Sequence, residues 1–361
     1  MDGLPDELLI SIVSLLSVNE AARTSVLAQR WRHYWIYNRI LNFDDGSEMV
    51  RERKRFVDWV NRVVSLHSGE SIDEFRVCLC LDKNSNGSDI DRWIEFALRK
   101  RVQKLELNFR QNRLGEDDEL VYSFPNVSNL GIGLSLVSLS LTRVGLTQEI
   151  LESFMSNCPT LEELHLENAY GLKIFRPSFR ANRLLRRLAL MDCMDLKIIE
   201  ICSPNLVSFA LSTWTDTVLN GVSSLTHLSL RAFVFFELLS HLQFLYEYLS
   251  RLKTLTLHTT STLLTGVLRR DPHRPRPPPK RQRMGLEKHE CLKVLEIVGY
   301  AGIALDLDMA LYVLNRAVSL EKVVIDGVAT TGKDDLHLLK RNLSAAAQKY
   351  SPYRRRTTNP S

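Results

Sequence analysis

Leucines recur along the chain in the order L-x-x-L-x-L. The strict pattern begins at Leu136, Leu161, Leu185, Leu225 and Leu252. When isoleucine, valine or phenylalanine is accepted at the apolar positions, the pattern also begins at Ile72, Val102, Leu206, Leu292 and Leu320. In an x-L-x-L segment, alternate side chains point to opposite faces, so each segment predicts a short strand with one apolar face.

The spacing of these segments predicts a stacked architecture. Successive patterns begin 19 to 40 residues apart, and a unit of that size cannot bury its apolar face alone. We therefore expect an irregular solenoid with parallel strands on its concave side and helices or turns on its convex side. Residues 90–98 and the aromatic-rich stretch 233–249 fit the role of such convex helices.

The outward strand residues, which flank the inner leucines, are the candidate recognition surface. They are chemically mixed and no charge sign dominates, which suits contact with a protein better than catalysis. The residues that we expect to bind a target are Glu163, His165, Arg187, His227, Arg231 and His258. The alternative is that most of them are ordinary solvated strand residues.

The turns before two strand segments read Asn157-Cys158-Pro159 and Cys202-Ser203-Pro204. With the repeat, they resemble the irregular, cysteine-containing form of leucine-rich repeat solenoids. In that setting we interpret the cysteines as small buried packing residues rather than metal ligands.

The first forty residues follow a helical pattern instead. Leu8, Leu9, Ile12, Leu15 and Leu16 have helical spacing, and a proline with two acids stands at the helix start. Ser17-Val18-Asn19 interrupts this helix, and two further short helices are expected before residue 42. Three short helices bury little surface alone, so this region should dock on a partner or on the neighbouring domain.

This region resembles the F-box, whose pattern is LP-x-(D/E)-L-x-x-x-I-L-x-x-L followed by V-L-(S/A)-x-R-W. Here the usual proline after the first helix is replaced by Ser17-Val18. The resemblance implies docking on the Skp-family adaptor of SCF-type cullin–RING ubiquitin ligases. The implied adaptor contacts are Leu4, Pro5, Leu8, Ile12, Leu15, Val26 and Trp31. Alternatively, some of these, Trp31 above all, hold the small domain together.

Residues 41–45, 56–60, 72–77 and 93–98 resemble the plant F-box/leucine-rich-repeat family, and residues 289–302 and 310–326 resemble its FBD region. The expected fold is α+β: a small three-helix F-box followed by the irregular solenoid. The expected boundaries are residues 1–42 for the F-box, 43–268 for the repeats, 269–285 for a disordered basic proline-rich insert, 286–350 for the FBD-like region with the last repeats and a cap, and 351–361 for a basic tail.

The net charge of +5 is unevenly distributed. Residues 269–283 carry +6 and Arg354 to Arg356 carry +3, so the rest of the 361 residues carries −4 and a nucleic-acid-binding face is not expected. The basic segment is either a solvated loop or a nuclear-import signal at residues 279–283. Without a basic leader or a long apolar run, we expect the nucleus, the cytoplasm or both, and no membrane.

The six cysteines form no CxxC pair, and no metal-binding or catalytic motif is found. Residues 327–333 match GxxxxGK, but Asp334 stands where a phosphate loop needs Ser or Thr, so we expect no nucleotide, metal or other cofactor. The resemblance implies a non-catalytic receptor subunit that presents a target protein to a ubiquitin ligase. The alternative is an interaction scaffold with a vestigial F-box. The target itself cannot be read from the outward residues.

Overall fold

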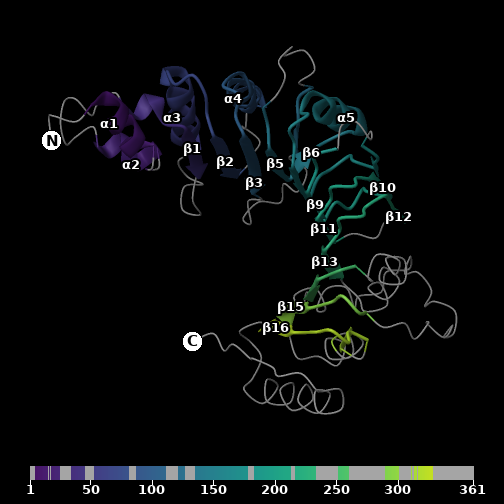
Figure 1. The fold of residues 1–361 in the computed structure, drawn as a ribbon. Coiled ribbons are helices and arrows are strands. Elements are labelled where there is room, and N and C mark those ends of the chain that lie inside the picture. Colours follow the sequence, from purple (N-terminus) through teal and green to yellow (C-terminus); the bar gives the residue numbers. More distant parts are fainter. Residues whose placement is uncertain are drawn as a thin grey trace. The chain divides into compact units, whose positions relative to one another are not determined.

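The structure is a computed structural model of the chain (Figure 1). It divides into two compact units: unit 1 is Met1–Asn205 with Thr215–Val222, and unit 2 is Leu206–Trp214 with Ser223–Ser361. The residues that the structure describes are 5–14, 16, 18–24, 34–44, 53–80, 87–110, 121–126, 135–177, 183–212, 216–232, 251–259, 289–300, 310, 313–314 and 316–327.

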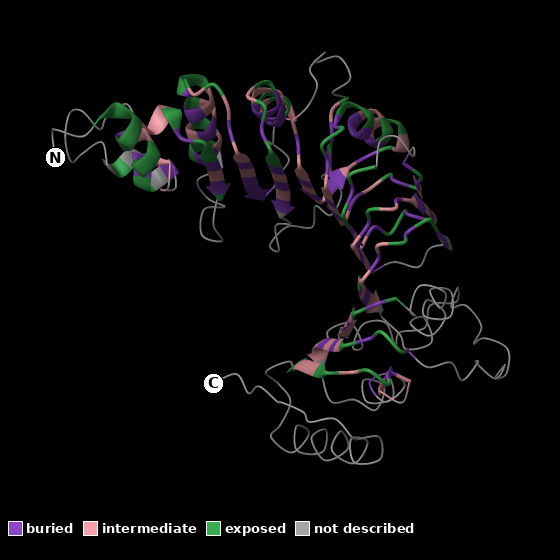
Figure 2. Cartoon of the chain, in the orientation of Figure 1, coloured by how far each residue is buried: buried purple, intermediate pink, exposed green. Residues whose placement is uncertain are grey.

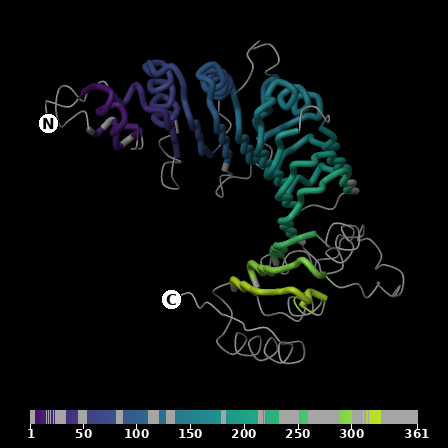
Figure 3. Tube along the Cα trace, in the orientation of Figure 1, coloured from purple at the N-terminus to yellow at the C-terminus, as the bar shows by residue number. Residues whose placement is uncertain are grey.

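Unit 1 begins with two short helices, α1 (Asp6–Val13) and α2 (Val18–Thr24), and a 3₁₀ turn at residues 34–37. A parallel sheet follows, in the order β1 (Ile40–Asp44), β2 (Glu74–Cys80), β3 (Lys104–Arg110), β5 (Ser138–Thr142), β7 (Glu163–Glu167) and β9 (Arg187–Met191). The connections carry α3 (Arg53–Leu66), α4 (Gly87–Arg99) and α5 (Gln148–Asn157). The strands therefore stack in chain order, as the colours in Figure 3 show.

Alternation within each strand places one face of this sheet in the core. The burial of β5 and β7 alternates strictly between half-buried and buried residues, which Figure 2 shows as bands along the strands. Leu139, Leu164 and Leu188 stand opposite one another on neighbouring strands and are all buried. A shift of one residue would turn these leucines to solvent, so the apolar pattern fixes the register.

The helices pack on the buried face of the sheet. Phe43 on β1 lies edge-on to Trp59 on α3, with ring centroids 5.0 Å apart, and Phe75 on β2 contacts Phe96 on α4. Trp93 of α4 is fully buried and donates a 2.7 Å hydrogen bond to Asn61 of α3. Each helix thus closes the core behind one or two strands.

Short strands form two further sheets in unit 1. One pairs β4 (Tyr122–Ser123) with β6 (Val144–Gly145), and the other has the order β12 (Asp216–Asn220), β10 (Ile198–Cys202) and β8 (Ile174–Phe175). Arg143, Asn168 and Asp192, each directly after a strand of the long sheet, have positive φ angles. A residue in the left-handed conformation thus turns the chain at the same place in three successive repeats. Two of the three are Asn or Asp, which tolerate this conformation best.

The long strands of unit 2 are also parallel neighbours, in the order β11 (Ser208–Leu211), β13 (His227–Ala232), β14 (Thr254–Thr259), β15 (Val294–Tyr300) and β16 (Lys322–Gly327). Leu228, Leu255 and Leu295 are in register on three neighbouring strands and are buried. The inward leucines of unit 2 are therefore buried in register, as those of unit 1 are.

The L-x-x-L-x-L pattern predicts the strands of both units. Every one of its ten starting positions lies two residues before a strand of the long sheets, and the helix expected at residues 90–98 is α4, so these predictions are confirmed. β1 and the strands of the shorter sheets were not predicted. Four predicted features lie outside the described residues: part of the third F-box helix, the stretch 233–249, the basic insert, and residues 328–333 of the GxxxxGK match.

Candidate protein interaction surfaces

Helix α1 presents an apolar surface to solvent. Leu9 and Val13 are fully buried, whereas Leu8 and Ile12 are 50% and 41% exposed. Pro5, Leu8 and Ile12 lie at positions i, i+3 and i+7, which share one face of a helix, and Pro5 is exposed as well. The helix therefore has two apolar stripes, of which only one serves the core.

Helix α4 shows that such exposure is not general in this unit. Its apolar residues Ile90, Trp93, Ile94, Ala97 and Leu98 are buried, and Phe96 is half-buried. This repeat helix thus uses most of its apolar face for packing, whereas α1 leaves a whole apolar stripe exposed.

Three of the seven residues expected to contact an adaptor can be placed in the structure. Pro5, Leu8 and Ile12 form the exposed stripe just described. The other four lie outside the described residues: Leu4, Leu15, Val26 and Trp31.

A buried polar joint connects the end of α1 to the first repeat. The Asn38 side chain, only 1% exposed, donates to the Leu16 carbonyl at 3.0 Å and accepts from the Ile40 amide at 3.0 Å. The Asn38 carbonyl accepts a 2.9 Å hydrogen bond from Nε2 of buried His67, just after α3. One residue therefore binds the α1 segment, β1 and the chain after α3, a link that no pattern in the sequence predicts.

His67 sits in this joint as a neutral ring. Because it donates from Nε2, Nδ1 carries no proton, and Nδ1 is buried without a hydrogen-bond partner in the described part of the chain. Burial is the main cause that lowers the pKa of His67; the bond to Asn38 opposes this, and nearby Lys100 adds to it.

The outward face of the unit 1 sheet carries charges that pair across strands. Arg187 on β9 donates to Glu163 on β7, its register partner, and Arg76 on β2 donates to Glu106 on β3 at 2.9 Å. His165 lies 3.8 Å from Glu167 of its own strand. The three unit 1 residues of the expected target-binding set thus interact with charged neighbours, two of them with each other.

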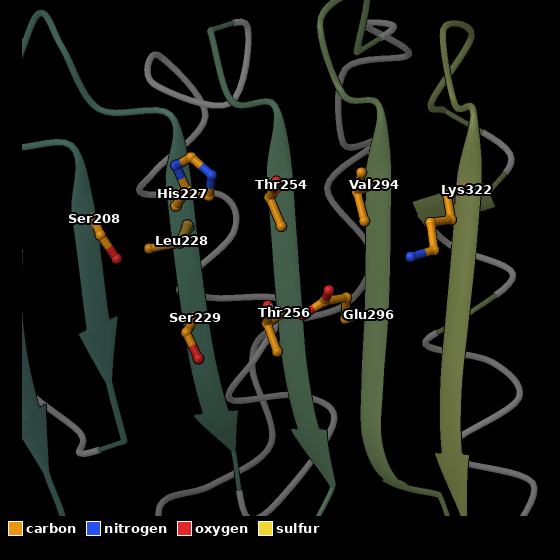
Figure 4. A pocket seen from close by; sticks show the side chains of 9 residues that line it. All are labelled: Ser208, His227, Leu228, Ser229, Thr254, Thr256, Val294, Glu296 and Lys322. Carbon is orange, nitrogen blue, oxygen red and sulfur yellow. Dashed lines mark hydrogen bonds between the residues drawn. The ribbon is translucent and has the colours of Figure 1, made fainter. Parts of the chain in front are cut away.

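The outward face of unit 2 contains a hollow with a volume of about 410 Å³ (Figure 4). It is lined by Ser208, His227, Leu228, Ser229, Thr254, Thr256, Val294, Glu296 and Lys322. Thr256 donates to Glu296 at 3.0 Å, and Thr226 lies 2.8 Å from Nδ1 of His227. We call this hollow the unit 2 groove.

The other two expected target-binding residues of unit 2 lie beside the groove. His258 follows Thr256 on β14, with its Nε2 3.0 Å from the Ser229 hydroxyl, and Arg231 is its register partner on β13. Burial, and then Arg231, lowers the pKa of His258. Glu296 and Lys322 were missed, although the pattern starting at Leu292 and Leu320 marks both positions as outward.

The described residues include histidine, cysteine, aspartate and glutamate side chains, which are the types that bind metal ions. None of their His, Cys, Asp and Glu side chains gather in groups of three or more that could hold a metal ion. Burial raises the pKa of Cys158 to about 12 and that of Cys193 to about 11, so neither thiol is ionised near neutrality. Cys158 is buried as expected, whereas Cys202 is half-buried. No helix in the described ranges is both long and apolar enough to cross a membrane.

Two protein families match the chain. The F-box domain matches residues 1–42, and the family described as At1g61320/AtMIF1, LRR domain matches residues 63–269. F-box domains generally bind Skp-family adaptors, and F-box/LRR proteins are generally non-catalytic subunits.

Similar proteins come from Arabidopsis thaliana. The F-box/LRR-repeat protein At3g58900 is 35% identical over 184 residues, covering 46% of this chain and 50% of that protein. The FBD-associated F-box protein At4g10400 is 29% identical over 239 residues, covering 60% of this chain and 56% of that protein. The chain spans about half the length of the curated relatives that it matches. Because the repeat-domain match alone covers more than half of its residues, the chain belongs to the F-box/LRR proteins whose repeats are of the At1g61320/AtMIF1 type.

Proposed function

We propose that the protein is the target-recognition subunit of an SCF-type cullin–RING ubiquitin ligase. In this proposal the F-box binds the Skp-family adaptor, the outward strand faces bind a target protein, and ubiquitin transfer is accelerated by proximity rather than by a side chain of this chain. The single observation that carries the proposal is the exposed stripe of Pro5, Leu8 and Ile12 on a helix whose other stripe is buried.

Physical chemistry favours a protein partner for this stripe. Burying an apolar side chain stabilises a complex by about 1.5–3 kcal/mol when the contact is complete, and Leu8 and Ile12 still have much of that area to bury. The family match places an F-box on the same residues. The Asn38 joint supports a fixed orientation of this stripe relative to the first repeats.

The experiment is co-purification and calorimetric titration of the full chain with a recombinant Skp-family adaptor. The double variant Leu8→Asp, Ile12→Asp places two carboxylates in the apolar contact, where their desolvation is not compensated. We expect the affinity to fall at least about 100-fold. Both positions are exposed in the free chain, so its thermal unfolding should change little.

The matched control is the double variant Met194→Asp, Val318→Asp. These apolar residues are also exposed, at 73% and 48%, but lie in the repeat part of the chain. The control should bind the adaptor normally. Normal binding by the α1 variant would show that the assigned docking face is wrong. A wild-type chain that binds no adaptor would leave the alternative, an interaction scaffold with a vestigial F-box.

We also propose that the protein works in the nucleus, the cytoplasm or both. The basic residues 269–283 support this proposal through their composition alone. Imaging a fluorescent fusion of the protein with and without this segment tests whether the segment directs it to the nucleus. The nuclear proposal is contradicted if the two fusions are distributed identically in the cell.

A further inference from the structure

The unit 2 groove is long across the strands and short along them. Its lining comes from all five strands of the unit 2 sheet, but from no more than three consecutive residues of any strand. Neighbouring strands lie about 4.8 Å apart and residues about 3.3 Å apart, so the groove measures about 19 Å by about 7 Å. This shape suits an extended chain better than a compact small molecule.

The groove offers hydrogen-bond donors at two separated points. His227 and Lys322 stand at the same level of the sheet, linked through Thr254 and Val294 by successive register pairs. Thr226 occupies one ring nitrogen of His227, which leaves the other for a ligand. Lys322 is exposed and forms no ion pair with any described residue, in contrast to Arg76 and Arg187 of unit 1.

The acceptor in the groove lies between these donors. Glu296 is on β15, between the strands of His227 and Lys322, and accepts from Thr256 with one carboxylate oxygen. Its other oxygen has no described hydrogen-bond partner. A ligand must therefore present acceptors at the two ends and a donor in the middle, since a second carboxylate beside Glu296 would be repelled.

We propose that the unit 2 groove binds an extended peptide segment of the target that runs across the strands and carries acidic side chains at positions i and i+4. His227 and Lys322 are three strands apart, about 14 Å, and side chains four residues apart on the same face of an extended peptide are separated by about 13 Å. Residue i+2 faces Glu296 and is Asn, Gln, Lys or Arg. The proposal deepens the target recognition proposed above and rests on it.

The test uses fluorescein-labelled nine-residue peptides and the full chain, with binding measured by fluorescence anisotropy. The probe has Glu at positions 3 and 7, Gln at position 5, and Gly or Ser elsewhere. One comparison peptide has Gln at all three positions, and another has Glu at positions 3 and 6, which face opposite sides. We expect both to bind at least about tenfold more weakly, because each loses a charge-assisted hydrogen bond.

Variants of the chain locate the site. Lys322→Gln should weaken binding of the probe at least about tenfold. Arg99→Gln, which removes an exposed cation paired with Glu95 on α4, and Lys293→Gln, which removes an exposed cation paired with Glu321 outside the groove, should leave binding unchanged. The proposal is overturned if Lys322→Gln binds normally, if the controls weaken binding equally, or if the peptide with Glu at 3 and 6 binds as well as the probe.

Glu296→Gln supplies a gain-of-binding test. This variant should accept Glu at the central position, so a peptide with Glu at 3, 5 and 7 should bind it at least about tenfold more tightly than the wild-type chain. An equal affinity would contradict the assigned role of Glu296. The adaptor-defective variant Leu8→Asp, Ile12→Asp should bind the probe normally, so a failure of the groove proposal and a failure of the adaptor proposal are distinguished.

Discussion

The outward strand faces of the two units use the same backbone pattern for different purposes. In unit 1, the cations Arg76 and Arg187 are paired with glutamates on neighbouring strands. In unit 2, the corresponding positions form a groove of hydroxyl groups, His227, Glu296 and Lys322, in which Lys322 has no ion-pair partner among the described residues. The two arginines of unit 1 are thus used within the outward face itself, whereas the unit 2 groove retains groups for a ligand.

This difference shows how a repeat protein separates stability from recognition. The inward leucines of both units are buried in register, so both sheets are held by the same core interactions. Outward residues face solvent and contribute little to the core, so they can differ between units without altering the fold. Recognition is therefore expected where outward polar groups remain unpaired.

The largest effect tests whether the two inward faces are equivalent. Leu164→Ala in unit 1 and Leu255→Ala in unit 2 each remove most of a fully buried side chain. Each should lower the free energy of unfolding by about 2–5 kcal/mol, measured by urea denaturation. If one of these substitutions lowers the free energy of unfolding by less than about 1 kcal/mol, the cores of the two units differ. The difference between the units is then not confined to their outward faces.

A smaller effect tests whether unit 1 uses its polar groups internally. Asn38→Ala leaves the part-buried Leu16 carbonyl and Ile40 amide without their side-chain partner, which should cost about 1–3 kcal/mol of unfolding free energy. The control is Asn42→Ala, because Oδ1 of Asn42 is buried without a hydrogen-bond partner in the described part of the chain. Equal losses in chemical denaturation would show that the Asn38 joint adds nothing specific.

The smallest effect is a pH dependence within the same joint. The pKa of His67 is lowered below its ordinary value of 6.5, chiefly by burial, so the unfolded chain binds a proton more readily than the folded one. The stability that this group contributes is present above about pH 6.5 and is lost as the pH falls through the lowered pKa, with a slope of at most about 1.4 kcal/mol per pH unit.

His67→Gln isolates this contribution. Glutamine can still donate to the Asn38 carbonyl but does not titrate, so the variant should lose less unfolding free energy than the wild type between pH 7 and pH 5. Parallel pH profiles in urea denaturation would show that His67 is not the group responsible.

The strands could be predicted from the sequence because their pattern is local. A period of two apolar positions needs only five or six residues to be recognised, and each pattern start precedes its strand by two residues. β1 was missed because Ile40–Asp44 lacks the preceding apolar residue of the full pattern and becomes a strand by pairing with β2. The same locality identified Leu8 and Ile12 as helix-face residues, but it could not show that they stay exposed.

The candidate recognition residues were predicted less completely because the sequence does not show which outward side chains pair with each other. Outward positions follow from alternation alone, but the state of each side chain depends on the strand beside it. Glu163 and Arg187 are 24 residues apart in the sequence and become partners only through the register of β7 and β9. Lys322 lacks such a partner among the described residues because Val294, not an acid, is its register neighbour on β15.

The sequence alone determined the elements of this protein: an amphipathic first helix, ten repeat strands and their inward leucines. These depend on the order of apolar and polar residues over a few positions, which fixes the faces that each element can bury. Only the tertiary structure decided which apolar stripe of α1 remained open, how Asn38 joined that helix to the first repeat, and where outward charges were paired. Those properties depend on contacts between residues distant in the chain, and no local pattern records them.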